Sequence, residues 1–288
     1  MNLRPSIMKR SRIDRISWAD IVAMIVVLLV VLVPLYFALS SAFKLQRDIF
    51  SFVPRILFSP NLRNFDRLTT NWPRYLGSIG TSALVTSISI MFMLLVALPS
   101  AYSFSRLPVK GVSLISFVLV ALRMFPPIVL TIPLYPLFRN LGLIDTPIGL
   151  ILLYASVQLP LIVLLLKAFM DTIPRELDEQ AWIDGCGRAE SFVRVIIPVM
   201  MPGIVAGGII VGTVVWNDFL FAFLFTGIRT KTAPIFIYEL LSGVGEGALS
   251  DWGQVFAATT LQFVPVLLVI WVFQRRMVSG VTIGAVKG

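Results

Sequence analysis

The sequence contains no histidine and only one cysteine, Cys186, among its 288 residues. One cysteine excludes a disulfide within the chain, and a lone thiol without histidine argues against a transition-metal site. No nucleophile and base pair typical of a membrane-embedded enzyme is present either. The chain lacks a G-x-x-x-x-G-K-[ST] phosphate loop, so it cannot bind ATP by that route. Any energy for its work must therefore come from a partner or from an ion gradient.

Charged residues are also scarce, at 14% of the chain, whereas hydrophobic residues make up 57% and the mean hydropathy is +0.90. Soluble domains carry nearer a quarter of charged residues. The composition therefore predicts an all-α polytopic membrane protein. The net charge of +9 comes from Lys and Arg that lie between apolar runs without aromatic interleaving. This arrangement favours contact with membrane lipid and gives no reason to expect nucleic acid.

Six apolar runs approach or exceed the roughly 20 residues that a membrane-spanning helix needs. They lie at about residues 21–43, 76–104, 112–137, 148–169, 203–226 and 255–274. The first run is longer than the apolar core of a signal peptide and lacks a cleavage site, so we expect it to remain as a span. Four prolines between residues 126 and 136 predict that the third span is irregular at its outer end, and Gln158 and Pro160 interrupt the fourth.

The distribution of Lys and Arg predicts the orientation of these spans. Fourteen lie on the side of the N-terminal tail and nine on the other, and the richer side faces the cytoplasm. Both termini are therefore expected in the cytoplasm. The predicted parts of the chain follow from this topology. They are an N-terminal tail 1–20, a transmembrane domain 21–276 with outer loops 44–75 and 227–254 and a cytoplasmic loop 171–198, and a C-terminal tail 277–288.

The cytoplasmic loop, which we call the insert, is the longest polar stretch in the C-terminal half. Asp171 or Thr172 can act as a helix N-cap, and Gly185 is a typical helix stop. Between them an apolar stripe every four residues places the polar side chains, including Asp178 and Glu179, on the opposite face. A helix of about three turns cannot cross a bilayer. It must lie on the surface of the membrane or against another molecule.

The insert resembles a motif of bacterial ABC importer permeases that reads E-A-A, three residues, G, nine residues, I-x-L-P. The corresponding residues are Glu179, Gln180, Ala181, Gly185, Val195, Ile197 and Pro198. Gln180 departs from the usual Ala, and Val195 and Ile197 are conservative departures. Three further features resemble the sugar-importer branch, nearest the smaller permease subunit of maltose-type systems. They are the pair Asp184 and Gly185, the run Trp216, Asn217 and Asp218, and the closing Gly284 to Gly288.

The resemblance implies a type I ABC importer permease fold with six spans in a bacterial inner membrane. It implies a heterodimer with a second permease subunit, two ATPase subunits that use ATP and Mg, and an extracytoplasmic solute-binding protein. This chain itself would bind no cofactor and catalyse no reaction. The insert would dock on the ATPase, with Glu179 supplying charge and Gly185 the turn. The tail, with Gly284, Lys287 and Gly288, would reach the ATPase, and the loop 227–254 would meet the binding protein.

Several alternatives remain open at this stage. The insert could simply anchor the chain at the lipid interface. An ion-gradient-driven secondary transporter is an alternative function, although the internal repeats common in that class are not evident. Asn217 and Asp218 either cap a broken helix or line the solute route. Arg123, within the third span, either pairs with Asp218, reaches the interface or contacts solute. The cargo could be a disaccharide, a polyol, a sugar phosphate or another acidic sugar.

Overall fold

The computed structural model describes residues 17–243 and 251–285. Within these ranges all regular structure is helical, without a strand, which confirms the expected all-α class. The elements are α1 (Trp18–Ser41), α2 (Gln46–Ile49), α3 (Arg63–Asn71), α4 (Tyr75–Arg106), α5 (Val112–Met124), α6 (Pro127–Asn140), α7 (Pro147–Thr172), α8 (Glu176–Ile183), α9 (Arg188–Ser191), the π-helical η1 (Phe192–Ile196), α10 (Ile197–Trp216), α11 (Leu220–Phe225), α12 (Ala233–Ser242) and α13 (Trp252–Ala285).

Five of the described helices are long and apolar enough to cross a membrane. They are α1, α4, α7, the continuous run from α9 through α10, and α13. The sixth candidate is α5 together with α6, which are bent by 95° at the break between them. The six predicted spans therefore correspond to five helices and one bent pair. Helix α13 also continues past the predicted end of its span at residue 274 and reaches Ala285.

Consecutive prolines cause the bend between α5 and α6. Phe125 and Pro126 each precede a proline and take extended backbone conformations, with ψ of 132° and 131°. Pro127 then occupies the first turn of α6, where a missing N–H group costs nothing. The irregularity predicted for this span is confirmed, and the break lies near the middle of the predicted range.

The interruption predicted for the fourth span is wrong. Helix α7 is continuous from Pro147 to Thr172, with Pro160 inside it. Half of its most apolar window is buried within the chain, more than for α1, α4 or α13. Proline is tolerated inside membrane helices where neighbouring helices cover the freed backbone groups. Small side chains of α4, such as Ala97 and Ala101, are fully buried in the core that α4 and α7 share with α10.

The glycines of α10 allow close packing against two different neighbours. A β-carbon at Gly203 would lie 2.7 Å from Phe169 of α7, and one at Gly212 would lie 2.7 Å from Ile90 of α4. The companion glycines Gly207 and Gly208 face the same two helices at ordinary contact distances of 3.6 and 3.7 Å. These four glycines therefore allow the close approach of helices that small residues provide in membrane bundles.

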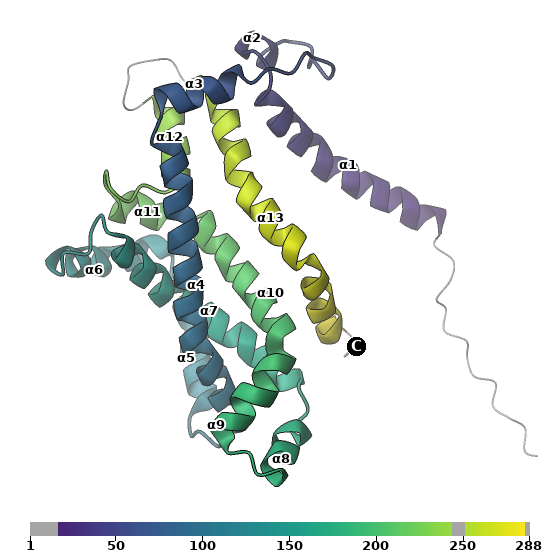
Figure 1. Cartoon of the computed structure of the whole chain (residues 1–288), viewed down its shortest axis with the longest axis vertical. Coiled ribbons are helices and arrows are strands. Elements are labelled where there is room, and N and C mark those ends of the chain that lie inside the picture. Colours follow the sequence, from purple (N-terminus) through teal and green to yellow (C-terminus); the bar gives the residue numbers. More distant parts are fainter. Residues whose placement is uncertain (1–16, 244–250, 286–288) are drawn as a thin grey trace, which may run out of the picture.

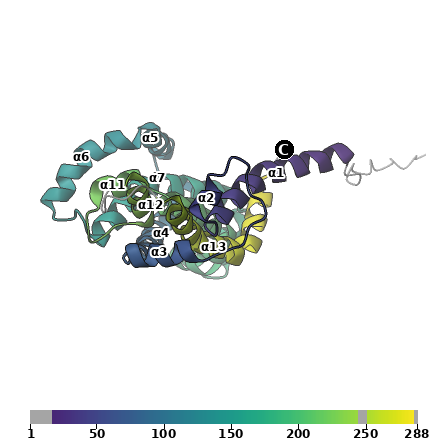
Figure 2. The ribbon, with the colours of Figure 1, turned by 90° about the horizontal axis from the view of Figure 1, so that it is seen from above.

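The bundle has two distinct ends (Figure 1). Helices α8 and α9 lie at one end, whereas α2, α3 and α12 lie at the other beside the start of α13. There the predicted outer loops form a second core, in which Leu68 and Tyr75 pack with Phe236 and Ala258. The Tyr75 hydroxyl donates a hydrogen bond to the Ala258 carbonyl at 2.6 Å. Seen from above, α6 and α1 extend from opposite sides of the bundle (Figure 2).

Candidate functional site

The insert is organised around α8, an eight-residue helix from Glu176 to Ile183. The predicted N-caps Asp171 and Thr172 are wrong, because α7 continues through Thr172. Ile173 is extended ahead of Pro174, as residues before proline prefer, and this conformation ends α7. Three acidic residues in the first turn of α8 then complement the positive end of the helix dipole.

The end of α8 is fixed by a glycine turn, as the sequence predicts. Asp184 is the C-cap, and Gly185 has φ of +88°, a conformation that favours glycine. The Gly185 N–H donates to the Trp182 carbonyl at 3.1 Å, and the Cys186 N–H donates to the Ala181 carbonyl at 2.9 Å. These two bonds form a Schellman motif. A β-carbon at Gly185 would meet no atom within 4 Å, so it is the backbone conformation that opposes one there.

Asp178 does not lie on the exposed polar face that the sequence predicts. It is 1% exposed, and its Oδ2 atom lies 2.9 Å from Nε of Arg106, whose side chain is 4% exposed. The Tyr102 hydroxyl donates a hydrogen bond to Asp178 Oδ1 at 3.1 Å. Asp178 and Ala181 are three residues apart and so share the inward face of α8. A buried ion pair therefore joins α8 to the last turn of α4.

Further hydrogen bonds attach the junction between α7 and α8 to the same end of α4. Nη2 of Arg106 donates to the Ile173 carbonyl at 2.7 Å. Nη2 of Arg175 donates to the Ser105 carbonyl at 2.9 Å, and the Ser105 hydroxyl donates to Asp171 at 2.6 Å. These bonds join the end of α4 to the end of α7 and to the residues just before α8. Helix α8 is therefore fixed to the ends of α4 and α7.

Beyond α8 the chain re-enters the bundle through α9, η1 and α10. Of the predicted motif residues, Val195 lies in η1, Ile197 begins α10 and Pro198 follows in its first turn. The Ile197 N–H donates to the Phe192 carbonyl, a π-helical bond, and Pro198 has no N–H to continue that pattern. The ring of Phe192 packs on Tyr102 with 4.9 Å between centroids. The exit of the insert is thus attached to α4 as well.

The face of α8 that points away from the bundle combines acidic and apolar side chains. Glu179 and Gln180 are exposed, whereas Ala181 is 6% exposed and faces inward. Next to them Ile183 is 85% exposed and Trp182 is 37% exposed. The sequence pattern did not single out these two apolar residues. Adjacent exposed apolar side chains rimmed by polar ones are typical of a surface that meets another protein.

The polar residues within the spans do not form an arginine–aspartate pair, which was one of the three alternatives for Arg123. Arg123 of α5 donates from Nη1 to Gln158 Oε1 of α7 at 2.7 Å. Asp218 instead accepts a hydrogen bond from the Tyr154 hydroxyl at 2.9 Å. Arg123 is exposed on the surface of this chain. The side-chain partner of Arg123 in this chain is therefore an amide and not the carboxylate of Asp218.

Asn217 and Asp218 cap a broken helix. Asn217 is the C-cap of α10 and donates from Nδ2 to the Thr213 carbonyl at 2.9 Å. Asp218 Oδ2 accepts two backbone N–H groups at the start of α11, both at 3.1 Å. Trp216 is buried, at 7% exposed, and its Nε1 atom has no hydrogen-bond partner among the described residues. The capping alternative accounts for both polar side chains.

Of the predicted tail contacts, Gly284 lies in α13. Lys287 and Gly288 lie outside the described residues, as does part of the loop 227–254.

A second organised site, at the end of the bundle opposite α8, was not predicted. Asp145, in the loop between α6 and α7, accepts hydrogen bonds from the backbone N–H groups of residues 227 to 230 at 2.8 to 3.2 Å. It also accepts the Thr230 hydroxyl at 2.7 Å. Burial on its own raises the pKa of Asp145, but these hydrogen bonds outweigh it and hold the pKa below its ordinary value. The carboxylate therefore fixes the start of the loop 227–254.

Comparison with known proteins identifies the family. Residues 95–283 match the family described as "Binding-protein-dependent transport system inner membrane component". The chain belongs to this family, and its members are membrane components of transport systems. The membership inferred from the motif of the insert is thereby confirmed.

Similar proteins extend over nearly the whole chain. The diacetylchitobiose uptake system permease protein DasC of Streptomyces coelicolor is 32% identical over 287 residues, which cover 98% of this chain and 100% of DasC. The trehalose/maltose transport system permease protein MalG of Thermococcus litoralis is 34% identical over 241 residues, 82% of this chain and 84% of MalG. Among solved structures, a bacterial ABC transporter involved in import of the acidic polysaccharide alginate has a chain of the same fold. The TM-score is 0.73 at 18% identity, covering 89% of this chain and 94% of that one.

Proposed function

We propose that the chain is a permease subunit of an ATP-driven importer for a sugar or sugar-like solute. In this proposal it forms half of the solute pathway together with a different, second permease subunit. The names of the relatives that carry diacetylchitobiose and trehalose or maltose support the saccharide class. The observation that carries the proposal is α8, which is ion-paired into the bundle on one side and exposed on the other.

In this proposal α8 couples the spans to an ATPase subunit. Glu179 supplies charge, Trp182 and Ile183 supply apolar contact, and Gly185 sets the turn. Because Arg106 and Asp178 tie α8 to α4, a displacement of α8 moves the core helices with it. A helix that only rests on lipid would carry Lys and Arg on its polar face, whereas the exposed charged residues of α8 are the acids Glu176 and Glu179. Its charge therefore favours a protein partner.

The remaining assignments follow from the same proposal. Two ATPase subunits use ATP and Mg, and this chain binds no cofactor of its own. The loop 227–254 meets an extracytoplasmic solute-binding protein, and the tail with Gly284, Lys287 and Gly288 reaches the ATPase dimer. The end of the bundle that carries α8 then faces the cytoplasm with both termini. The opposite end faces outward from the inner membrane.

Uptake into proteoliposomes tests the function. The complex is purified through a tag on this chain, and uptake of labelled neutral and acidic disaccharides is followed with ion gradients collapsed by ionophores. We expect uptake only when ATP and the binding protein are supplied. Uptake that needs an ion gradient and ignores ATP would show a secondary transporter instead.

A pair of variants tests the role of α8. Ile183→Asp places a charge on the proposed docking face and should lower ATP-dependent uptake about tenfold, because a buried unpaired charge opposes association. Leu57→Asp is the matched control, since Leu57 is 93% exposed at the other end of the bundle. Equal uptake by both variants would contradict the docking of α8.

A further inference from the structure

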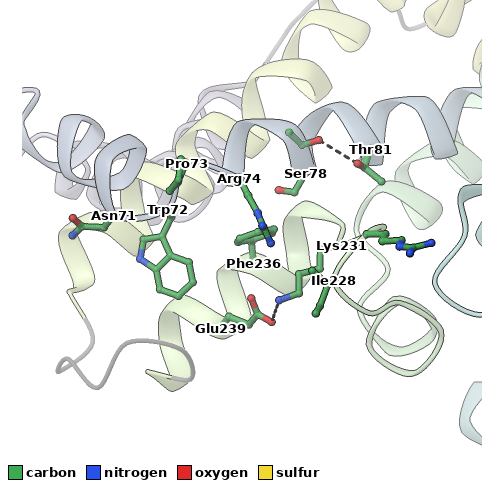
Figure 3. A pocket seen from close by; sticks show the side chains of 12 residues that line it. Asn71, Trp72, Pro73, Arg74, Ser78, Thr81, Ile228, Lys231, Phe236 and Glu239 are labelled. Carbon is green, nitrogen blue, oxygen red and sulfur yellow. Dashed lines mark hydrogen bonds and ion pairs between the residues drawn. The ribbon is translucent and has the colours of Figure 1, made fainter.

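A cavity of about 530 Å³ lies at the end of the bundle opposite α8 (Figure 3). Its walls come from the junction of α3 and α4 on one side and from residues 228–239, which include the start of α12, on the other. The volume falls within the roughly 300 to 1,000 Å³ typical of pockets that hold small molecules. One wall belongs to the loop 227–254, for which a contact with the binding protein is proposed, but that proposal names no ligand for the cavity itself.

One corner of the cavity is aromatic. The rings of Trp72 and Phe236 meet edge to face, with centroids 6.3 Å apart. Phe236 is 6% exposed and is held by the second core, whereas the indole of Trp72 is half-buried. Figure 3 shows the indole beside Glu239 at the side of the cavity. A half-buried indole that lines the cavity offers an apolar platform next to polar groups, which suits the apolar face of a sugar ring.

The residues around this corner carry more positive than negative charge. Lys231 Nζ lies 2.6 Å from Glu239 Oε1, with both side chains largely buried, so these two neutralise each other. Arg74 and Arg229 also line the cavity, and neither guanidinium has an ion pair or a hydrogen bond among the described residues. Guanidinium groups match carboxylate, sulfonate and phosphate oxygens in paired hydrogen bonds. The cavity therefore presents two uncompensated positive charges beside an aromatic platform.

The walls are fixed before any ligand binds. Asp145 accepts the backbone N–H groups of Arg229 and Thr230 at 3.2 and 3.0 Å. The Ala233 N–H, at the start of α12, donates to the Ser82 hydroxyl of α4 at 2.9 Å. The bonds to Asp145 hold the backbone of one wall, and the Ala233–Ser82 bond joins α12 to α4, so little ordering of the backbone is required on binding. Preorganisation of this kind favours affinity.

We propose that this cavity binds a sugar that carries an acidic group, such as a uronic acid. The ring packs on Trp72, and the acidic group meets Arg74 and Arg229. The inference rests on the proposed function. Within that function it places the solute in this cavity, at the outer end of the bundle, before the solute passes into the bundle. It adds a solute class, acidic saccharides, and names the side chains that select it.

Binding to the full chain in lipid nanodiscs tests the proposal without ATP or partners. Digalacturonate is the probe, maltose is the neutral disaccharide, and inorganic sulfate is the anion without a ring. We expect saturable binding of digalacturonate, at least about tenfold tighter than that of maltose or sulfate. Equal binding of maltose, equal binding of sulfate, or no binding of digalacturonate would overturn the proposal.

Three variants locate the site. Arg74→Gln and Arg229→Gln should each weaken digalacturonate binding about tenfold, the loss of one charge-assisted contact. Arg63→Gln is the matched control, because Arg63 is an exposed arginine at the same end of the bundle that does not line the cavity. An equal loss in all three variants would show attraction by the surface in general and would overturn the assignment. A cavity that instead receives an acidic segment of a protein partner would not distinguish digalacturonate from sulfate.

This experiment and the uptake assay fail separately. If digalacturonate does not bind, the acidic-sugar site is refuted, but a finding of ATP-dependent uptake of neutral sugars still stands. Absence of ATP-dependent uptake for every sugar removes the proposed function, whatever the nanodisc titration shows.

Discussion

The buried pair of Arg106 and Asp178 makes the sharpest prediction, through the variant Asp178→Asn. The asparagine keeps the shape of the side chain but leaves the Arg106 guanidinium, 4% exposed, without its counter-charge. Removing one partner of a buried ion pair costs about 3 to 5 kcal/mol. The Tyr102 hydroxyl can still donate to an amide oxygen, so the loss comes mainly from the charge. We expect a fall of about 3 kcal/mol in the free energy of unfolding, near the lower end of that range.

Denaturant unfolding in mixed micelles measures this change, and uptake per ATP hydrolysed measures coupling. The control is Glu190→Gln, which breaks the exposed pair of Glu190 and Arg194, 41% and 74% exposed, and should cost no more than about 0.5 kcal/mol. The double variant Arg106→Met with Asp178→Leu removes both charges and should recover much of the stability, since apolar replacement of a buried pair is often neutral. If Asp178→Asn and Glu190→Gln were equally stable and equally coupled, the buried pair would not hold α8 in place.

Three further predictions follow from other parts of the chain. Gly185→Val should abolish ATP-coupled uptake while the chain still reaches the membrane, because φ of +88° strains a β-branched residue, whereas Gly187→Val, at φ of −69°, should be tolerated. Asp145 has a lowered pKa, so its stabilisation of residues 227 to 230 is complete above its ordinary pKa of about 4 and is lost as the pH falls through the lower value of the folded state. Hydrogen exchange should show those amides protected at pH 7 and less so near pH 3, and Asp145→Asn should remove the protection already at pH 7. Gly203→Ala should lower stability by about 1 to 3 kcal/mol, because its β-carbon would lie 2.7 Å from Phe169, whereas Gly207→Ala should cost less at 3.6 Å; equal unfolding midpoints would contradict the packing.

Features that depend on neighbouring residues could be predicted from the sequence. The apolar runs gave the long helices, because a bilayer imposes a length and a composition on each span. The consecutive prolines after Phe125 predicted a break, and Gly185 predicted the end of α8. Each of these follows from the conformation that one residue or its neighbour can adopt.

Features that depend on contacts between distant segments could not be predicted in this way. The pattern of α8 assigned Asp178 to the solvent, because nothing local reveals that Arg106 faces it from α4. One alternative placed Arg123 beside the carboxylate of Asp218, but its hydrogen bond goes to Gln158. The role of Asp145 was not predicted, because its hydrogen bonds go to residues 227 to 230. The residues next to it in the sequence do not indicate those partners. In all three cases the partner is chosen by packing of the helices.

Helix α1 contrasts with these sites, because no residue in its most apolar 18-residue window is buried within the chain. Interchange among leucine, isoleucine, valine and phenylalanine there changes no buried side chain inside this subunit, whereas the same changes in α7, half buried, would open or crowd the core. Apolar substitutions scanned along α1 should therefore leave uptake unchanged at every position whose side chain contacts only lipid. Away from the contacts of α1 with α13, each position where the scan does reduce function marks a contact with another molecule.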